Sequence, residues 1–178
     1  MRVHGLLLAA GAGRRMGTPK ALVDDWLLRT IGVLEDGGCD EVTVVLGAAA
    51  DQARVLLEGS DVAVVVAADW AQGMGASLRA GLSALPAGDA ALVSLVDLPD
   101  VGPEVVRRVL AAPFVSTTLR RAAYEAVPGH PVLLGRGHWD GVLNAARGDR
   151  GARDYLSAHE VELVECADLA TGRDVDSR

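Results

Sequence analysis

The sequence predicts a three-layer α/β fold, in which helices cover both faces of a mainly parallel β-sheet. Three observations support this fold class. Short runs of Val, Leu and Ala alternate along the chain with amphipathic stretches of helical length. These apolar runs show no strict alternation with polar residues, as expected of strands that are covered on both faces. Aromatic residues make up only 3% of the chain, so Ala, Val and Leu must build the core.

The elements follow one another in a regular order. Strands are expected at residues 3–9, 41–47, 62–68, 90–97, 130–135 and 161–165. Helices are expected at residues 26–34, 51–57, 75–85, 103–110 and 150–158, with Pro103 in a first helical turn, where proline is favoured. The crossovers should be right-handed. A chain of 178 residues is expected to form one domain, residues 1–178, with a frayed segment at 170–178.

The overall charge argues against two classes of partner. The formal net charge is −7 and the isoelectric point is near 5.0, so neither nucleic acid nor a membrane surface would attract the chain. The apolar run after Arg2 is too short for a signal peptide, and no stretch approaches a membrane span. We therefore expect a cytoplasmic protein, with Cys39 and Cys166 as free thiols.

The first loop gathers positive charge in an acidic protein. The stretch GLLLAAGAGRRMGTPKALV (residues 5–23) holds three glycines after a strand and contains Lys20, the only lysine in the chain. Glycines let backbone N–H groups approach an anion closely, and the basic side chains add charge. The spacing matches neither the dinucleotide fingerprint nor the Walker loop. Two interpretations remain: a cradle for a triphosphate, or a tight turn with solvated arginines.

An acidic residue ends another predicted strand. Ligands of α/β sheets bind beyond the carboxyl ends of the strands, which places the loops after residues 10, 69 and 97 on one rim. Asp97 ends a buried strand, where a carboxylate is costly without a cation or hydrogen-bond donors. Mg²⁺ prefers such carboxylates together with phosphate oxygens. The alternative is a turn-capping carboxylate, which fits Asp100 better.

The string LAAGAGRRMGTPKAL resembles the nucleotide-binding signature of the MobA-like nucleotidyltransferases of molybdenum-cofactor biosynthesis. The resemblance extends from residue 3 to about residue 165. It implies a Rossmann-like nucleotidyltransferase fold with a mostly parallel, mixed sheet. It also implies that the phosphates of a nucleoside triphosphate (NTP) are held by the loop, and that Asp97 binds a catalytic Mg²⁺. The residues given the phosphate role are Ala10, Gly11, Gly13, Arg14 and Lys20, while Arg15 is expected to be solvated.

A second stretch of sequence points to one branch of this family. QGMGASLRAGL (residues 72–82) is similar to a segment of the molybdopterin cytidylyltransferases, which implies CTP rather than GTP. By that resemblance Gln72, Gly73, Met74 and Ser77 lie beside the nucleotide or the pterin. Taken on its own, Ser77 could instead cap the helix that follows.

Three later residues are candidates for the acceptor side of the site. His130 precedes a proline, so its backbone should be extended and its ring should point toward the rim. Asp149 could cap the following helix or lie near the metal, and Arg153 could pair with it or contact the phosphate of the pterin. The chain departs from the family in two places, where the hairpin that usually follows residue 23 is missing and the segment near Phe114 is short.

The expected activity is therefore that of a Mg²⁺-dependent nucleotidyltransferase, which transfers CMP from CTP to the phosphate of molybdopterin and releases pyrophosphate. Asp97 would hold the metal, while Lys20 and Arg14 would stabilise the leaving pyrophosphate. A molybdoenzyme or its maturation factor is an expected partner. The alternatives are transfer from GTP, transfer to a sugar or alditol phosphate, and a non-catalytic protein that binds or matures the cofactor.

Overall fold

The computed structural model describes residues 1–177 and contains one seven-stranded sheet in the order β3-β2-β1-β4-β6-β5-β7. The strands are β1 (Val3–Ala9), β2 (Glu41–Leu46), β3 (Ala63–Val66), β4 (Ala90–Leu95), β5 (Leu119–Tyr124), β6 (Val127–Gly135) and β7 (Glu162–Glu165). The pairs β1–β2, β1–β4, β2–β3 and β5–β7 are parallel, and β6 is antiparallel to both β4 and β5. The predicted α/β fold with a mostly parallel, mixed sheet is confirmed.

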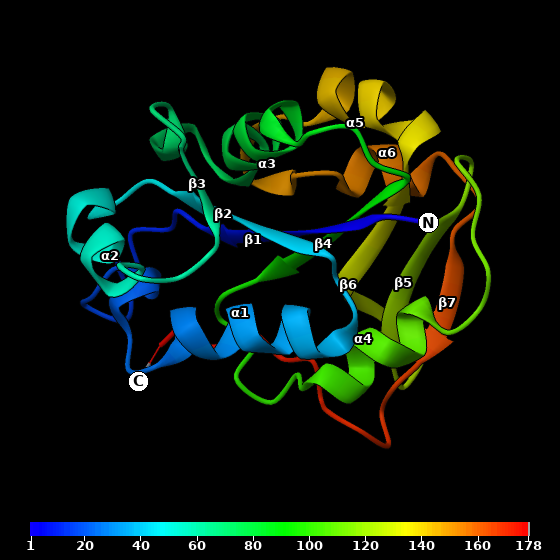
Figure 1. Ribbon diagram of the computed structural model, residues 1–178, viewed down its shortest axis with the longest axis horizontal. Coiled ribbons are helices and arrows are strands. Elements are labelled where there is room, and N and C mark those ends of the chain that lie inside the picture. The colour runs from blue at the N-terminus through cyan, green and yellow to red at the C-terminus, as the bar shows by residue number, and fades with distance from the viewer. Residues whose placement is uncertain (178) are drawn as a thin grey trace.

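Helices cover both faces of the sheet (Figure 1). They are α1 (Trp26–Gly37), α2 (Ala50–Leu56), α3 (Met74–Ala84), α4 (Pro103–Leu110), α5 (Trp139–Ala145) and α6 (Arg153–Ser157). One core layer joins α1, α2 and α4 to the sheet and includes Leu7, Val44 and Leu92. The other joins α3, α5 and α6 to the opposite face and includes Leu6 and Val45. Neighbouring residues of one strand thus enter opposite layers, which is why the strands read as unbroken apolar runs.

Three elements differ from the sequence prediction. Strand β5 was not predicted, because its sequence LRRAAY carries two arginines. Arg120 is nonetheless buried, since it donates to the carbonyl oxygens of Val109, Ala112 and Pro113 and pairs with Glu162. Helix α5 was also missed, because WDGVLNA is short and contains a glycine. The expected helix at 150–158 is shorter, and a 3₁₀ turn at Gly148–Arg150 precedes it.

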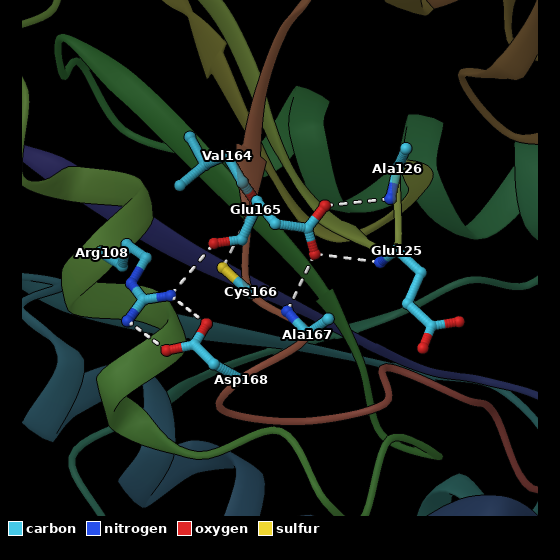
Figure 2. Close-up of polar contacts among 8 residues, drawn as sticks. All are labelled: Arg108, Glu125, Ala126, Val164, Glu165, Cys166, Ala167 and Asp168. Atoms are coloured by element: carbon cyan, nitrogen blue, oxygen red, sulfur yellow. Dashed lines mark hydrogen bonds and ion pairs between the residues drawn. The ribbon is translucent and has the colours of Figure 1, made fainter.

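Strand β7 is fixed to its neighbours by polar contacts that also anchor the C-terminal segment. Figure 2 shows the Glu165 carboxylate accepting hydrogen bonds from the backbone N–H groups of Glu125, Ala126 and Ala167. Those donors, Ala126 first, lower the pKa of Glu165. Arg108 makes a two-pronged ion pair with Asp168 and also donates to the Glu165 carbonyl oxygen. The first residues after β7 are therefore held against α4 through Asp168.

Candidate active site

The loops after β1, β3 and β4 meet around one cavity of about 430 Å³, which we call the loop cavity. Its wall includes Leu8 and Leu95 from the ends of β1 and β4, and Trp70 from the 3₁₀ turn (Trp70–Gln72) after β3. Predicted site residues in its wall are Ala10, Gly11, Gly13, Arg14, Lys20, Gly73, Met74, Ser77, Asp97 and Asp149. The expected rim at the carboxyl ends of the parallel strands is thus where these residues come together.

The glycine-rich loop folds tightly over the end of β1. Gly13 has φ +58, and a Cβ there would overlap the Thr18 carbonyl oxygen. The N–H of Met16 donates to the Gly13 carbonyl oxygen (2.9 Å), and the N–H of Lys20 donates to that of Gly11 (3.2 Å). The 3₁₀ turn at Lys20–Leu22 follows directly. The Lys20 side chain lies beside the glycine loop, since a Cβ on Gly11 would be 3.8 Å from Lys20 Cδ.

Two adjacent arginines of this loop have different environments. Both arginines are exposed, but Arg14 lines the loop cavity and Arg15 does not. The pKa of Asp176 is lowered mainly by its hydrogen bond from Lys20, and the charge of Arg15 adds to this effect. Between the two, Arg14 is the one that lines the cavity.

Lys20 and Asp97 form an ion pair at the centre of the site. The Lys20 Nζ donates to Asp97 Oδ2 and also to Asp176 Oδ1, at 2.8 Å. Asp97 is only 6% exposed. Burial acts to lower the pKa of Lys20, but its hydrogen bonds to Asp176 and Asp97, together with the charges of these two carboxylates, outweigh it and raise this pKa, so the ammonium stays charged at neutral pH.

Asp97 belongs to a carboxylate trio with Asp174 and Asp176, whose ligand oxygens lie within 4.8 Å of one another. Burial first, then a hydrogen bond with Asp176 and the negative charges of Asp176 and Asp97, raise the pKa of Asp174, as expected where carboxylates lie close together. One lysine neutralises only part of the charge of three carboxylates. A hard divalent cation with oxygen ligands, such as Mg²⁺, fits this donor set.

Asp174 and Asp176 come from the segment 170–178, which the sequence predicts to be frayed. Its described part has no regular secondary structure, but it is tied to the site. The N–H and hydroxyl of Thr171 both donate to Asp100 Oδ2 (2.7 and 2.6 Å), and the Val175 N–H donates to the Asp97 carbonyl oxygen (3.0 Å). Asp100, expected to cap a turn, thus anchors this segment instead. These long-range contacts have no periodic sequence pattern, although the spacing D-x-D was a visible signal.

In the segment at residues 72–82, Ser77 does not cap α3 as predicted, and the glycines have the structural role instead. Gly73 is the N-cap of α3, and Ser77 is buried inside the helix without a capping hydrogen bond, so the predicted cap is wrong. Side chains at Gly73 and Gly75 would collide with the turn at residues 147–149. The glycines therefore let this turn approach α3 and bring Asp149 into the loop cavity. Asp149 does not cap α6, whose N-cap is Ala152.

A second cavity of about 330 Å³, the arginine cavity, adjoins the first. The two share Leu8, Met74, Leu95 and Asp149. The predicted acceptor-side residues His130 and Arg153 line the arginine cavity together with Arg121, which the sequence analysis did not single out. Among the described residues, Gln72 is exposed and belongs to the wall of neither cavity.

Burial of His130 should make the free energy of unfolding depend on pH. Burial, and secondly the charge of Arg121, lower the pKa of His130 to about 4, so the ring is neutral at pH 7. Because its pKa is ordinary in the unfolded chain, stability is complete above about pH 6.5 and falls as the pH drops toward 4. Between pH 7 and 4 the wild type should lose roughly 3 kcal/mol more unfolding free energy than His130→Gln. Urea unfolding at each pH measures this; parallel losses in both proteins would contradict it.

Comparison with known proteins identifies the family. The model of the MobA-like NTP transferase domain matches residues 5–163. The chain belongs to this family. It is 37% identical to the nicotine blue oxidoreductase of Paenarthrobacter nicotinovorans, over 98% of this chain and 92% of that protein.

Solved structures share the fold. Rv0371c from Mycobacterium tuberculosis H37Rv superposes with a TM-score of 0.82 at 28% identity, covering 99% of this chain and 94% of that one. A complex of Rv0371c with manganese gives a TM-score of 0.75 at 26% identity, covering 93% and 89%. A nucleotidyl transferase from Methanothermobacter thermautotroptrophicus gives 0.84 at 23% identity, covering 99% and 92%.

The family and the fold make the chain a nucleotidyltransferase in the broad sense of NTP transfer. No helix in residues 1–177 is long and apolar enough to cross a membrane. The family model covers every residue that lines the loop cavity, Asp97 included, but ends before the segment that carries Asp174 and Asp176.

Proposed function

We propose that the protein transfers CMP from CTP to the phosphate of molybdopterin and releases pyrophosphate. The observation that carries this proposal is the meeting of the glycine loop, Lys20 and the buried Asp97 around one cavity at the carboxyl ends of the strands. The similarity of residues 72–82 to the cytidylyltransferase segment supports CTP. The arginine cavity, which adjoins the loop cavity, supports an acceptor that carries a phosphate.

The proposed reaction is an in-line displacement. An oxygen of the acceptor phosphate forms a bond to the α-phosphorus of CTP, while the bond between that phosphorus and the bridging oxygen to the β-phosphate breaks. The acceptor phosphate is already ionised at neutral pH, so no general base is required. The backbone N–H groups of the loop would orient the triphosphate, and Arg14 and Lys20 would stabilise the charge that collects on the leaving pyrophosphate.

Asp97, Asp174 and Asp176 would hold a Mg²⁺ ion, which on binding neutralises phosphate charge and polarises the reacting phosphoryl group. Lys20 would then exchange its bonds with two of these carboxylates for bonds with the phosphates. The manganese complex of Rv0371c, a relative with this fold, supports a divalent cation.

The loop geometry makes a prediction about nucleotide affinity. Gly13→Ala should weaken CTP binding by roughly tenfold or more, because a left-handed alanine costs about 1–2 kcal/mol and its Cβ displaces the turn at Thr18. Gly17→Ala is the matched control, since Gly17 also has a positive φ (+75) but a Cβ there meets nothing within 4 Å. Calorimetric titration with CTP compares the two; equal affinities in both variants would argue against a phosphate role for the loop.

The domain organisation, cellular location and partner of the protein are part of the same proposal. The whole chain, residues 1–178, would act as one domain in the cytoplasm and deliver its product to a molybdoenzyme or to the maturation factor of one. Transfer from GTP, transfer to a sugar or alditol phosphate, and non-catalytic cofactor binding are the alternatives. Titration with CTP, GTP and ATP, each with Mg²⁺, and pyrophosphate assays with sugar phosphates in place of the pterin separate them.

A second candidate function is oxidoreduction, which the name of the relative from Paenarthrobacter nicotinovorans motivates. Such an activity needs an electron donor, for which a nicotinamide dinucleotide is a common choice. The glycine spacing of the first loop differs from the dinucleotide fingerprint, which disfavours this candidate. Absorbance assays with reduced nicotinamide dinucleotides and an aromatic dye test it directly, and dye-dependent oxidation of the dinucleotide would favour it over nucleotidyl transfer.

A further inference from the structure

Trp70 is the one aromatic residue among the described residues that line the loop cavity, and the proposed reaction does not use it. It begins the 3₁₀ turn that follows β3. The start of its side chain packs on Gly47, just after β2, because a Cβ on Gly47 would be 2.5 Å from Trp70 Cβ and Cγ. The residue is half-buried against the core layer that includes α3. Packing therefore holds Trp70 in place, while part of it stays open to the cavity.

The part of the cavity wall that residues 70–77 contribute carries no positive charge. After Trp70 it includes Gly73, Met74 and Ser77. The charged residue beside this part is Asp149, since a Cβ on Gly73 would be 2.4 Å from Asp149 Oδ1. A carboxylate repels the phosphates of a nucleotide. This side of the cavity therefore suits the uncharged end of a nucleotide better than its phosphates.

A buried hydroxyl without a partner belongs to the same part of the wall. Ser77 is only 5% exposed and lines the loop cavity. Within residues 1–177 its hydroxyl makes no hydrogen bond. Because a buried polar group without a partner costs free energy, a ligand here should offer a polar group. Nucleobases meet both needs, since their edges carry hydrogen-bonding groups and their faces stack on aromatic side chains.

The order of the strands separates Trp70 from the metal-binding carboxylate. Along the sheet the order is β3, β2, β1, β4. Gly47 follows β2, the glycine loop follows β1 and Asp97 follows β4. Trp70 packs on Gly47, and β2 lies two strands from β4, which corresponds to roughly 10 Å. This separation can hold the two ends of one nucleotide, with the glycine loop between them.

We propose that the nucleobase lies against Trp70 with one edge near Ser77, and that the triphosphate extends across the glycine loop toward Lys20 and Asp97. This inference rests on the proposed nucleotidyl transfer and adds the direction in which the nucleotide binds. An indole face stacks on any base. Trp70 therefore contributes affinity for the nucleoside and does not select among bases.

Calorimetric titrations of the whole protein test this with two probes, CTP and inorganic tripolyphosphate, each with Mg²⁺. Trp70→Leu keeps an apolar side chain on Gly47 but removes the aromatic face. It should bind CTP roughly five- to a hundredfold more weakly than the wild type, the usual effect of losing one stacked base. It should bind tripolyphosphate, which has no base, like the wild type. Trp70→Phe keeps an aromatic face and should stay within about threefold of the wild-type affinity for CTP.

Tryptophan fluorescence gives a second measurement. CTP should quench the emission of the wild type, and tripolyphosphate should not. The quenching should disappear in Trp70→Phe although this variant still binds CTP. Trp26→Phe is the matched control, because Trp26 is buried and is not in the wall of the loop cavity, so its replacement should leave the quenching intact.

Three results would overturn the inference: wild-type affinity for CTP in Trp70→Leu, an equal loss of affinity for tripolyphosphate in that variant, or quenching that persists in Trp70→Phe. If the wild type binds ATP or GTP but not CTP, with quenching that depends on Trp70, the base site stands and the transfer from CTP fails. If pyrophosphate release from CTP requires the pterin while CTP affinity does not depend on Trp70, the transfer stands and the base site fails.

Discussion

Replacing Asp97 with asparagine is expected to reduce pyrophosphate release from CTP and molybdopterin by roughly 10²–10³-fold, the usual effect of removing one preorganised electrostatic group. Asp97 is the buried member of the carboxylate trio, and it lies in the turn that directly follows β4. Asparagine preserves its shape but removes the charge that a divalent cation requires.

The fold should survive this change. Lys20 would still donate to Asp176 at 2.8 Å, so its charge would not be left unpaired. Steady-state rates and urea unfolding of Asp97→Asn should therefore show lost turnover with nearly unchanged stability. Asp51→Asn, which alters an exposed aspartate in the first turn of α2, serves as the matched control. Turnover of Asp97→Asn close to that of the wild type would refute the metal role.

Replacing Lys20 with methionine should have a comparable effect on turnover, again roughly 10²–10³-fold, because the leaving pyrophosphate loses its main cationic partner. The same substitution should increase the affinity of the site for a divalent cation. In the absence of nucleotide, Lys20 occupies Asp97 and Asp176, two of the three carboxylates that would bind the ion. Without the ammonium, the trio should bind Mn²⁺ more tightly, by about tenfold if one charge-assisted hydrogen bond is released.

Titration of free Mn²⁺ by electron paramagnetic resonance measures this second effect. Lys20→Arg is the informative control, since it retains the charge and should retain the weaker metal affinity of the wild type. Two outcomes separate the roles of Lys20. Lost turnover with increased metal affinity is expected; unchanged metal affinity in Lys20→Met would show that the lysine does not compete for the carboxylates.

Local sequence patterns predicted the central part of this molecule well. The apolar runs of β1, β2 and β4 need no long-range information, since burial on both faces determines their composition. The carboxyl ends of parallel strands share one edge, so the approach of Asp97 to the glycine loop followed from the fold class alone.

The features that local patterns missed depend on contacts across long sequence distances. Strand β5 contains the buried Arg120, whose burial is possible only because carbonyl oxygens from the end of α4 and beyond, together with Glu162, satisfy it. The placement of Asp174 and Asp176 depends on Asp100 and on the backbone of Asp97, more than seventy residues earlier. Such tertiary contacts override local propensity and leave no periodic pattern to read.

The most direct test of the account is pyrophosphate release with Mg²⁺ and CTP, GTP or ATP, each with and without molybdopterin. A molybdopterin cytidylyltransferase should release pyrophosphate only when the pterin is present, and fastest with CTP. Release that is independent of molybdopterin, or the absence of release with all three nucleotides although they bind, would contradict the assignment as a molybdopterin cytidylyltransferase.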